Sequence, residues 1–226
     1  MIADKDVLYE DNHLIAVNKK AGVLVQGDKT GDDSLLDGLS VYLKIKYNKP
    51  GNVFTGLIHR IDRPVSGLVL LAKTSKGLSR MNELFKNRKI TKTYLAIVEG
   101  KVDQKNGTLV SFMKKNEKQN KSYVSKKENG GYKRAELQFE TLQLLDHYSL
   151  LEVFPLTGRH HQIRAQLAEM GHPIKGDLKY GAKRSNEDGS ICLHAFRLEF
   201  EHPIKKETLT IRAPVPQIDT WKYISP

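Results

Sequence analysis

The stretch with the clearest chemical potential runs from Gly56 to Gly67, with the sequence GLIHRIDRPVSG. Asp62 stands in it between two arginines, Arg60 and Arg63, and a proline and a glycine then indicate a turn. Flanking cations favour the ionised form of a carboxylate, which suits a nucleophile or an electrostatic stabiliser better than a general acid. A surface turn whose aspartate caps neighbouring backbone amides would use the same residues. The motif alone leaves both interpretations open.

The elements around this motif follow from hydrophobic periodicity and turn residues. The apolar run 68–72 predicts a buried strand directly after the motif, which places Asp62 at the mouth of a strand. A helix over 35–43 begins at Ser34 with Asp32 or Asp33 as its cap, and a later helix is capped by Thr157 or Gly158 and stopped by Gly171. The other predicted elements are a helix over 75–85 and strands over 7–10, 13–18, 92–100, 133–145, 148–154, 192–200 and 208–212.

Tyr94 and Arg164 are the other two side chains that these elements would present to a site. Alternation along 92–100 places Tyr94 on the face opposite Leu95, although an ordinary core tyrosine fits the pattern as well. Arg164 lies one helical step from the apolar stripe of Ile163 and Leu167, so it can face a neighbouring site.

Charge indicates the kind of partner. The 226 residues include 37 Lys and Arg against 26 Asp and Glu, a formal charge of +11, which favours a polyanion and above all RNA or DNA. Residues 114–134 hold eight basic and two acidic side chains, a net +6, together with the turn sequence 129–131. This stretch predicts a basic loop or hairpin, and a solvated Lys-rich surface loop remains the alternative.

Length and composition favour one globular domain over 1–226, with a core of about 7–215 and the basic loop at about 114–134. The single cysteine, Cys192, and the absence of zinc-type spacing predict no disulfide and no metal, and no glycine pattern predicts a dinucleotide cofactor. The N-terminal residues contain no apolar signal core, and no run is long enough to cross a bilayer. We therefore expect a cytoplasmic monomer without a membrane association.

Three segments occur in one order: 59–62 (HRID), 92–94 (KTY) and 158–164 (GRHHQIR), followed by 171–177 (GHPIKGD) and a Tyr-Gly pair at 180–181. Together they closely resemble the RluA-type pseudouridine synthases over nearly the whole chain. The resemblance implies an α+β fold, with a mixed, largely antiparallel and bent β-sheet flanked by helices and a central active-site cleft. It also implies an isomerase that converts specific uridines of structured RNA, rRNA or tRNA, to pseudouridine without a cofactor.

By this resemblance Asp62 is the catalytic aspartate, Tyr94 packs on the target base, and Arg164 is the basic partner of the aspartate. Arg60 would fill the gap left by the flipped nucleotide. The resemblance assigns substrate contacts as well to His59, Arg63, Arg159 and Gln162. Val65 stands where many members carry threonine. There is no room before Val7 for the extra RNA-binding module of some relatives, so we expect the RNA contacts to come from the catalytic domain.

Two other function classes use the same residues. A histidine-based RNA-cleaving enzyme would draw its acid and base from five histidines: His59, His160, His161, His172 and His194. A catalytically silent RNA-binding module needs the positive charge but not Asp62. Analysis of RNA after incubation separates the three classes, by new pseudouridine, strand breaks or neither.

Overall fold

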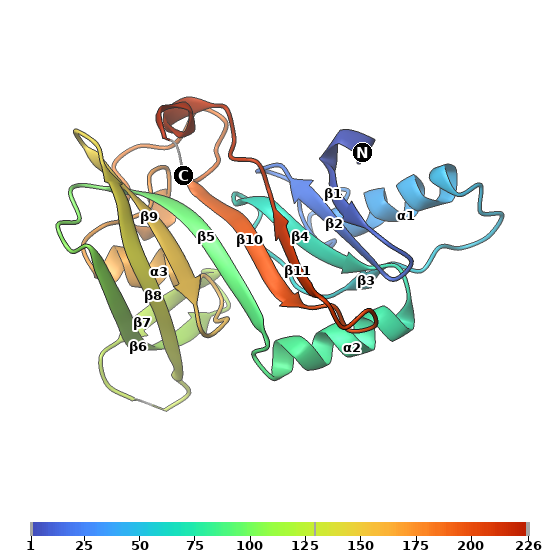
Figure 1. Cartoon of the computed structure of the whole chain (residues 1–226). Coiled ribbons are helices and arrows are strands. Elements are labelled where there is room, and N and C mark those ends of the chain that lie inside the picture. The colour runs from blue at the N-terminus through green and yellow to red at the C-terminus, as the bar shows by residue number, and fades with distance from the viewer. Residues whose placement is uncertain (1, 129, 225–226) are drawn as a thin grey trace. The chain divides into compact units, whose positions relative to one another are not determined.

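A computed structural model describes residues 2–128 and 130–224 of the chain (Figure 1). Contacts divide the chain into two compact units. The first consists of residues up to Lys92 together with Ala195–Val215, and the second begins with Thr93–His194 and takes in the chain after Val215. The predicted single catalytic domain, which would contain both units, stays a prediction.

The first unit contains antiparallel strands that frame the Asp62 motif. Strand β2 lies between β1 and β4, β3 also pairs with β4, and β10 pairs with β11. These strands form because apolar residues alternate or run continuously, and Leu68, Leu70 and Ala72 of β4 enter the core. Their bounds are β1 Val7–Glu10, β2 Leu14–Lys19, β3 Gly56–Leu57, β4 Ser66–Ala72, β10 Leu193–Glu201 and β11 Thr208–Arg212.

Two α-helices complete the first unit. Helix α1 (Leu35–Lys46) is capped by Ser34, which forms a capping box with Asp37, so the expectation of a cap at Asp32 or Asp33 is wrong. Helix α2 (Ser75–Lys86) packs Met81 into the core beneath β4, with the stripe predicted from the sequence (Figure 1). A short 3₁₀ helix, η1 (Asp4–Asp6), precedes β1.

The second unit is an antiparallel sheet in the order β5-β9-β8-β6-β7. Strands β6 and β7 form a hairpin within the basic stretch, but it turns at 117–120 and not at the predicted turn 129–131, which lies between β7 and β8 and whose Asn129 falls outside the described residues. The strand bounds are β5 Ile90–Glu99, β6 Asn106–Asn116, β7 Lys121–Ser125, β8 Lys133–Leu144 and β9 Tyr148–Pro155.

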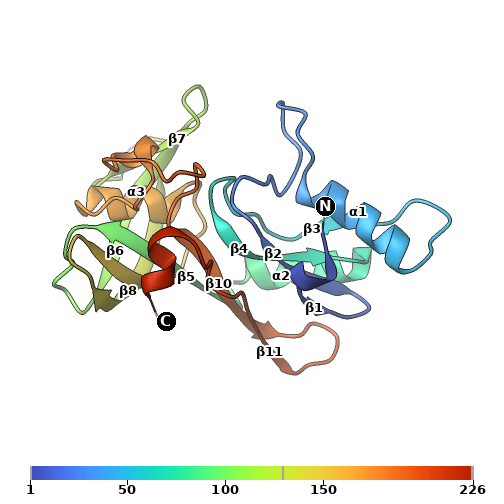
Figure 2. The same ribbon diagram turned by 90° about the horizontal axis from the view of Figure 1, so that it is seen from above.

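Helix α3 (Gln162–Glu169) lies against β6 and β7 (Figures 1 and 2). It begins later than predicted, because His161 precedes it in the left-handed conformation (φ 53°) and the Thr157 hydroxyl instead binds the β8 backbone at Glu136. The predicted caps at Thr157 and Gly158 are therefore wrong. The 3₁₀ helices η2 (Leu178–Tyr180) and η3 (Asp219–Tyr223) complete the unit.

The α+β class and the largely antiparallel strand pairing are confirmed. The bend of the sheet and the central cleft stay predictions. Within the described residues, none of the helices has the length and apolar character needed to cross a membrane.

Candidate functional site

The Asp62 loop connects β3 to β4 in the first unit. Its turn closes where the Val65 amide donates to the Asp62 carbonyl oxygen (3.1 Å), and the Asp62 side chain is half-buried. Gly67 follows with φ +112°, and a Cβ on it would lie 2.3 Å from the carbonyl oxygen of Ala195. Only glycine fits this position, so the loop meets β4 in one fixed way.

Lys19, at the end of β2, is the residue of this region that sequence reasoning missed. Its side chain is 1% exposed, and its ammonium donates to the carbonyl oxygens of Lys20 (3.0 Å), Val23 (2.8 Å) and Arg63 (3.2 Å). Burial lowers the pKa of Lys19 to about 7, which the negative charge of Asp62 opposes and the positive charge of Arg63 assists. The available signal was a lysine that ends an apolar strand and precedes a glycine turn.

The two arginines beside Asp62 behave differently. Arg60 is exposed, as expected. Arg63 is also exposed, with 47% of its side chain accessible, but it is bonded as well: its Nε donates to the Gly22 carbonyl oxygen (2.9 Å) and its Nη2 pairs with the exposed Asp32 (2.8 Å). The Gly22 amide in turn donates to the Arg63 carbonyl oxygen (2.8 Å). Arg63 thus ties the Asp62 loop to the segment before α1, and a contact of its guanidinium with substrate stays a prediction.

The His59 ring is held in place by contacts with β4 and α2. Its Nε2 accepts the Leu70 backbone N–H (3.0 Å), so the neutral ring carries its proton on Nδ1, and the ring stacks on Phe85 with centroids 5.3 Å apart. Burial, with a smaller contribution from the charge of Lys92, lowers the pKa of His59 to about 3. A histidine that is neutral at pH 7 is a poor acid, which argues against a role in RNA cleavage. Its assignment to substrate binding stays a prediction.

Tyr94 lies on β5, opposite Val153 of β9. Leu95 and Ile97 are fully buried, and so are Ala96 and Val98 on the Tyr94 face, whereas Tyr94 itself is half-buried. Its contact with a base stays a prediction.

Arg164, on α3, is buried and bound to a partner that sequence reasoning missed. Its Nε donates to Asp177 Oδ2 (2.7 Å) and its Nη2 donates to Asp177 Oδ1 (2.8 Å). The two side chains are 5% and 1% exposed. The guanidinium carbon also lies 5.1 Å from the centroid of the Tyr180 ring. One edge and one face of the guanidinium are thus defined by the protein, which fixes its plane.

Arg159 and Gln162 bind the protein around the start of α3. The Arg159 Nε donates to the Arg134 carbonyl oxygen (2.9 Å). The Gln162 Oε1 accepts from the Thr157 hydroxyl (2.8 Å) and the Arg159 amide (2.9 Å). Gln162 is buried, so this side chain closes the loop before the helix. Contacts of both residues with RNA stay predictions.

The remaining histidines of the RNA-cleavage alternative have contacts inside the second unit. The Nδ1 of His160 lies 2.9 Å from the Ser122 hydroxyl, and that of His161 lies 2.9 Å from the Tyr180 hydroxyl. His172 Nδ1 contacts the Glu99 carbonyl oxygen (2.9 Å), and the ring of His194 packs edge-on against Trp221. These contacts give each ring a structural use, which does not favour this alternative.

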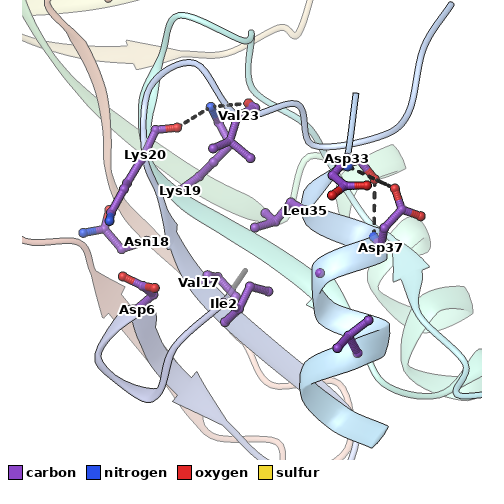
Figure 3. Close-up of a pocket in the computed structure, with 13 residues that line it drawn as sticks. Ile2, Asp6, Val17, Asn18, Lys19, Lys20, Val23, Asp33, Leu35 and Asp37 are labelled. Atoms are coloured by element: carbon purple, nitrogen blue, oxygen red, sulfur yellow. Dashed lines mark hydrogen bonds between the residues drawn. The ribbon is translucent and has the colours of Figure 1, made fainter. Parts of the chain in front are cut away.

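A pocket of about 520 Å³ opens between β2 and the start of α1 (Figure 3). Val17 and Leu35 form part of its apolar wall, and Asp33 lies at its α1 side. Figure 3 shows the Lys19 ammonium between the carbonyls of Lys20 and Val23. None of the predicted site residues lines this pocket. Among the described residues there is no cluster of three His, Cys, Asp or Glu side chains that could hold a metal ion.

Comparison with known proteins decides the family. Residues 13–169 match the family model described as RNA pseudouridylate synthase. The chain belongs to this family. The resemblance indicated by the three sequence motifs is therefore confirmed at the level of the family, and the Asp62 loop and the Arg164 helix both fall within the matched residues.

Two relatives with curated descriptions match nearly all of this chain. Ribosomal large subunit pseudouridine synthase C of Pasteurella multocida is 33% identical, over 94% of this chain and 65% of that protein. The uncharacterized RNA pseudouridine synthase YlyB of Bacillus subtilis is 31% identical, over 95% of this chain and 70% of that protein. The chain thus spans about two thirds of the length of these relatives.

Solved structures show the same fold. Human RNA pseudouridylate synthase domain containing 4 superposes with a TM-score of 0.78 at 23% identity, over 94% of this chain and 89% of that one. Human RNA pseudouridylate synthase domain containing 1 gives a TM-score of 0.71 at 24% identity, over 94% and 84%.

Proposed function

We propose that this chain is an RNA pseudouridine synthase that isomerises specific uridines of structured RNA. The observation that carries the proposal is the Asp62 loop of a chain in this family. Lys19 binds the loop at the Arg63 carbonyl oxygen, His59 accepts the Leu70 N–H of β4, and Gly67 packs closely against Ala195 of β10. A carboxylate held in this way is preorganised for chemistry, because its position does not have to be found anew in each turnover.

The reaction needs few groups. The bond between uracil N1 and ribose C1′ breaks, the base turns, and a bond forms between C5 and C1′. A proton leaves C5 and one is gained at N1, so substrate and product have one formula and no oxidant, reductant or water is consumed. Asp62 would attack the ribose, attack the base or remove a proton from the ribose. Each route uses an ionised carboxylate in a site that excludes water.

Arg164 is the proposed partner of Asp62, with an Asp62 oxygen within about 4 Å of an Arg164 nitrogen. A buried carboxylate is costly without a cation, and a guanidinium also orients it. The pair between Arg164 and Asp177 supports this role, because it holds the guanidinium by its Nε–Nη2 edge and fixes its orientation. Tyr94 would border the same site and replace the stacking that the flipped uracil loses.

RNA would reach this site through exposed cations. Arg60, which is exposed, would fill the vacancy of the flipped nucleotide. The β6–β7 hairpin and its flanks would hold phosphates, and Tyr123 there is 43% exposed and available for stacking. The relatives named for the ribosomal large subunit favour rRNA over tRNA as substrate. We expect the protein to bind and modify RNA as a monomer in the cytoplasm.

The test is incubation of the purified protein with total RNA from a strain that lacks it, with and without chelator. New pseudouridine at defined positions, formed at the same rate with chelator, is the expected result. Strand breaks would instead identify an RNA-cleaving enzyme, and binding with neither change would identify an RNA-binding module. Activity that chelator abolishes and a divalent metal restores, without refolding the RNA, would contradict the proposed cofactor-free mechanism.

A further inference from the structure

Two residues that contact the Arg164 guanidinium come from one turn of the second unit. Asp177 binds its Nε–Nη2 edge, and the Tyr180 ring lies 5.1 Å from its carbon. The Tyr180 amide donates to the Asp177 carbonyl oxygen (3.0 Å), which closes the turn and sets the spacing between the two side chains. Any movement of Tyr180 would therefore also displace the Asp177 carboxylate and the Arg164 guanidinium.

The hydroxyl of Tyr180 binds elements that are distant in sequence. It accepts the Ser122 backbone N–H of β7 (2.8 Å) and lies 2.9 Å from Nδ1 of His161, the residue before α3. The tip of the β6–β7 hairpin is held to the same turn a second time, because Lys179 Nζ donates to the Asn120 carbonyl oxygen (3.1 Å).

The hairpin also places a positive charge beside the Tyr180 ring. Lys121 Nζ lies 5.2 Å from the ring centroid, so this ring is near two cations, one from the hairpin and one from α3. Tyr180 itself is only 9% exposed. A side chain that is nearly buried, bonded at its hydroxyl and in contact through its ring has little freedom to reorient.

We propose that Tyr180 is a positioning residue that holds the Arg164 guanidinium in its catalytic orientation and ties it to the β6–β7 hairpin. This inference rests on the proposed function, in which Arg164 pairs with Asp62 and the hairpin contacts RNA. The ring limits the tilt of the guanidinium, and the hydroxyl fixes the ring to the hairpin. The folded hairpin thus steadies, through Tyr180, the arginine that the reaction uses.

Two variants separate the ring from the hydroxyl. Tyr180→Phe keeps the ring against Arg164 and removes the bonds to Ser122 and His161, whereas Tyr180→Leu removes both. We expect the single-turnover rate at saturating RNA to fall about tenfold in the first variant and about a hundredfold in the second, since small misplacements of catalytic groups have effects of this size. The dissociation constant for RNA should stay within about threefold of wild type.

Tyr42→Phe is the matched control. Tyr42 is also 9% exposed, and its hydroxyl donates to Asp4 (2.7 Å) in the first unit, far along the chain from the proposed machinery. Both Phe variants lose a bonded, nearly buried hydroxyl, so thermal melts should show comparable losses of stability. The rate should fall only for Tyr180→Phe. Wild-type rates in Tyr180→Phe and Tyr180→Leu would overturn the inference.

A double-mutant cycle tests whether Tyr180 acts through Arg164. Arg164→Lys removes the planar group that the ring contacts, so adding Tyr180→Phe to it should lower the single-turnover rate less than twofold further. Additive losses would show that Tyr180 acts on something else and would overturn the inference while the proposed function stands. A wild-type protein that forms no pseudouridine in any RNA would instead overturn both.

Discussion

The buried ammonium of Lys19 donates a hydrogen bond to the carbonyl oxygen of Arg63, the residue directly after Asp62. The same ammonium also binds the carbonyls of Lys20 and Val23, so two backbone segments, the turn after β2 and the Asp62 loop, converge on one side chain. The position of Asp62 therefore depends on a lysine 43 residues earlier in the chain.

Lys19→Met should lower both stability and activity. The variant keeps most of the length of the side chain but removes the ammonium donor from three carbonyls, of which, among the described residues, only that of Arg63 keeps another donor, the Gly22 N–H. We expect this to cost about 1–3 kcal/mol of unfolding free energy, even after the cost of burying an amine is relieved. A loosened Asp62 loop should also lower the single-turnover rate at least tenfold. Chemical denaturation and pseudouridine formation measure the two effects.

The control for this variant is Lys20→Met, because Lys20 is exposed and contributes only its backbone carbonyl to the cluster. It should match wild type in both measurements. Equal behaviour of Lys19→Met and Lys20→Met would contradict the anchoring role of Lys19.

The lowered pKa of His59 predicts that the folded protein loses stability in acid. Its pKa falls from 6.5 to about 3 in the folded protein, so between these values the unfolded chain binds more protons than the folded one. Stability is then complete above about pH 6.5 and falls as the pH decreases toward 3, by about 1 kcal/mol per pH unit for this group. His59→Gln, which can still accept the Leu70 N–H, should flatten the stability profile between pH 6.5 and 4.5.

His147→Gln is the control for the pH experiment, since His147 is exposed on the turn between β8 and β9. Its stability profile should run parallel to that of wild type. A His59→Gln profile as steep as wild type would show that His59 does not carry the acid sensitivity.

The β6–β7 hairpin should contribute affinity and not chemistry. Replacing Lys114, Lys118, Lys126 and Lys127 by Gln removes four exposed cations, so the dependence of log affinity on log salt should become shallower, by about 0.7–0.9 for each lost phosphate contact. The single-turnover rate at saturating RNA should be unchanged. Filter binding over a range of salt concentrations gives the slope.

A matched set of four exposed lysines in the first unit, Lys5, Lys29, Lys44 and Lys49, tests whether the effect is local. Their replacement by Gln changes the net charge equally and should leave the salt slope close to that of wild type. If both sets gave the same slope, affinity would come from net charge and not from the hairpin.

The sequence predicts most elements of this fold because their periodicity is local. The apolar stripe of Leu78, Met81 and Leu84 predicts α2, and the apolar run 68–72 predicts β4. The start of α3 is different: the sequence predicts that the Thr157 hydroxyl caps the helix, but in the structure this hydroxyl accepts the backbone N–H of Glu136 in β8. Such a competition is decided by tertiary contacts, and no local pattern reports it.

The sequence predicted the types of residue in the candidate site, but it did not predict the residues that hold them in place. Asp62, Tyr94 and Arg164 were identified from motifs, and the structure places each on or beside the element expected for it. The supports, Lys19 and Asp177, are joined to the site by contacts across 44 and 13 residues of sequence. A buried lysine that binds only carbonyls has no charge pattern to reveal it, so its role emerges only from the packed structure.

The central claim is that Asp62 performs the chemistry, and the most direct test compares Asp62→Asn with wild type in single-turnover formation of pseudouridine at saturating RNA. The amide retains the size of the side chain and removes the charge, and Asp33→Asn, an exposed aspartate outside the loop, is the control. We predict no detectable product from Asp62→Asn, with RNA affinity within about threefold of wild type because binding depends on many phosphate contacts. Pseudouridine formed by Asp62→Asn, in a preparation free of wild-type enzyme, would contradict the account.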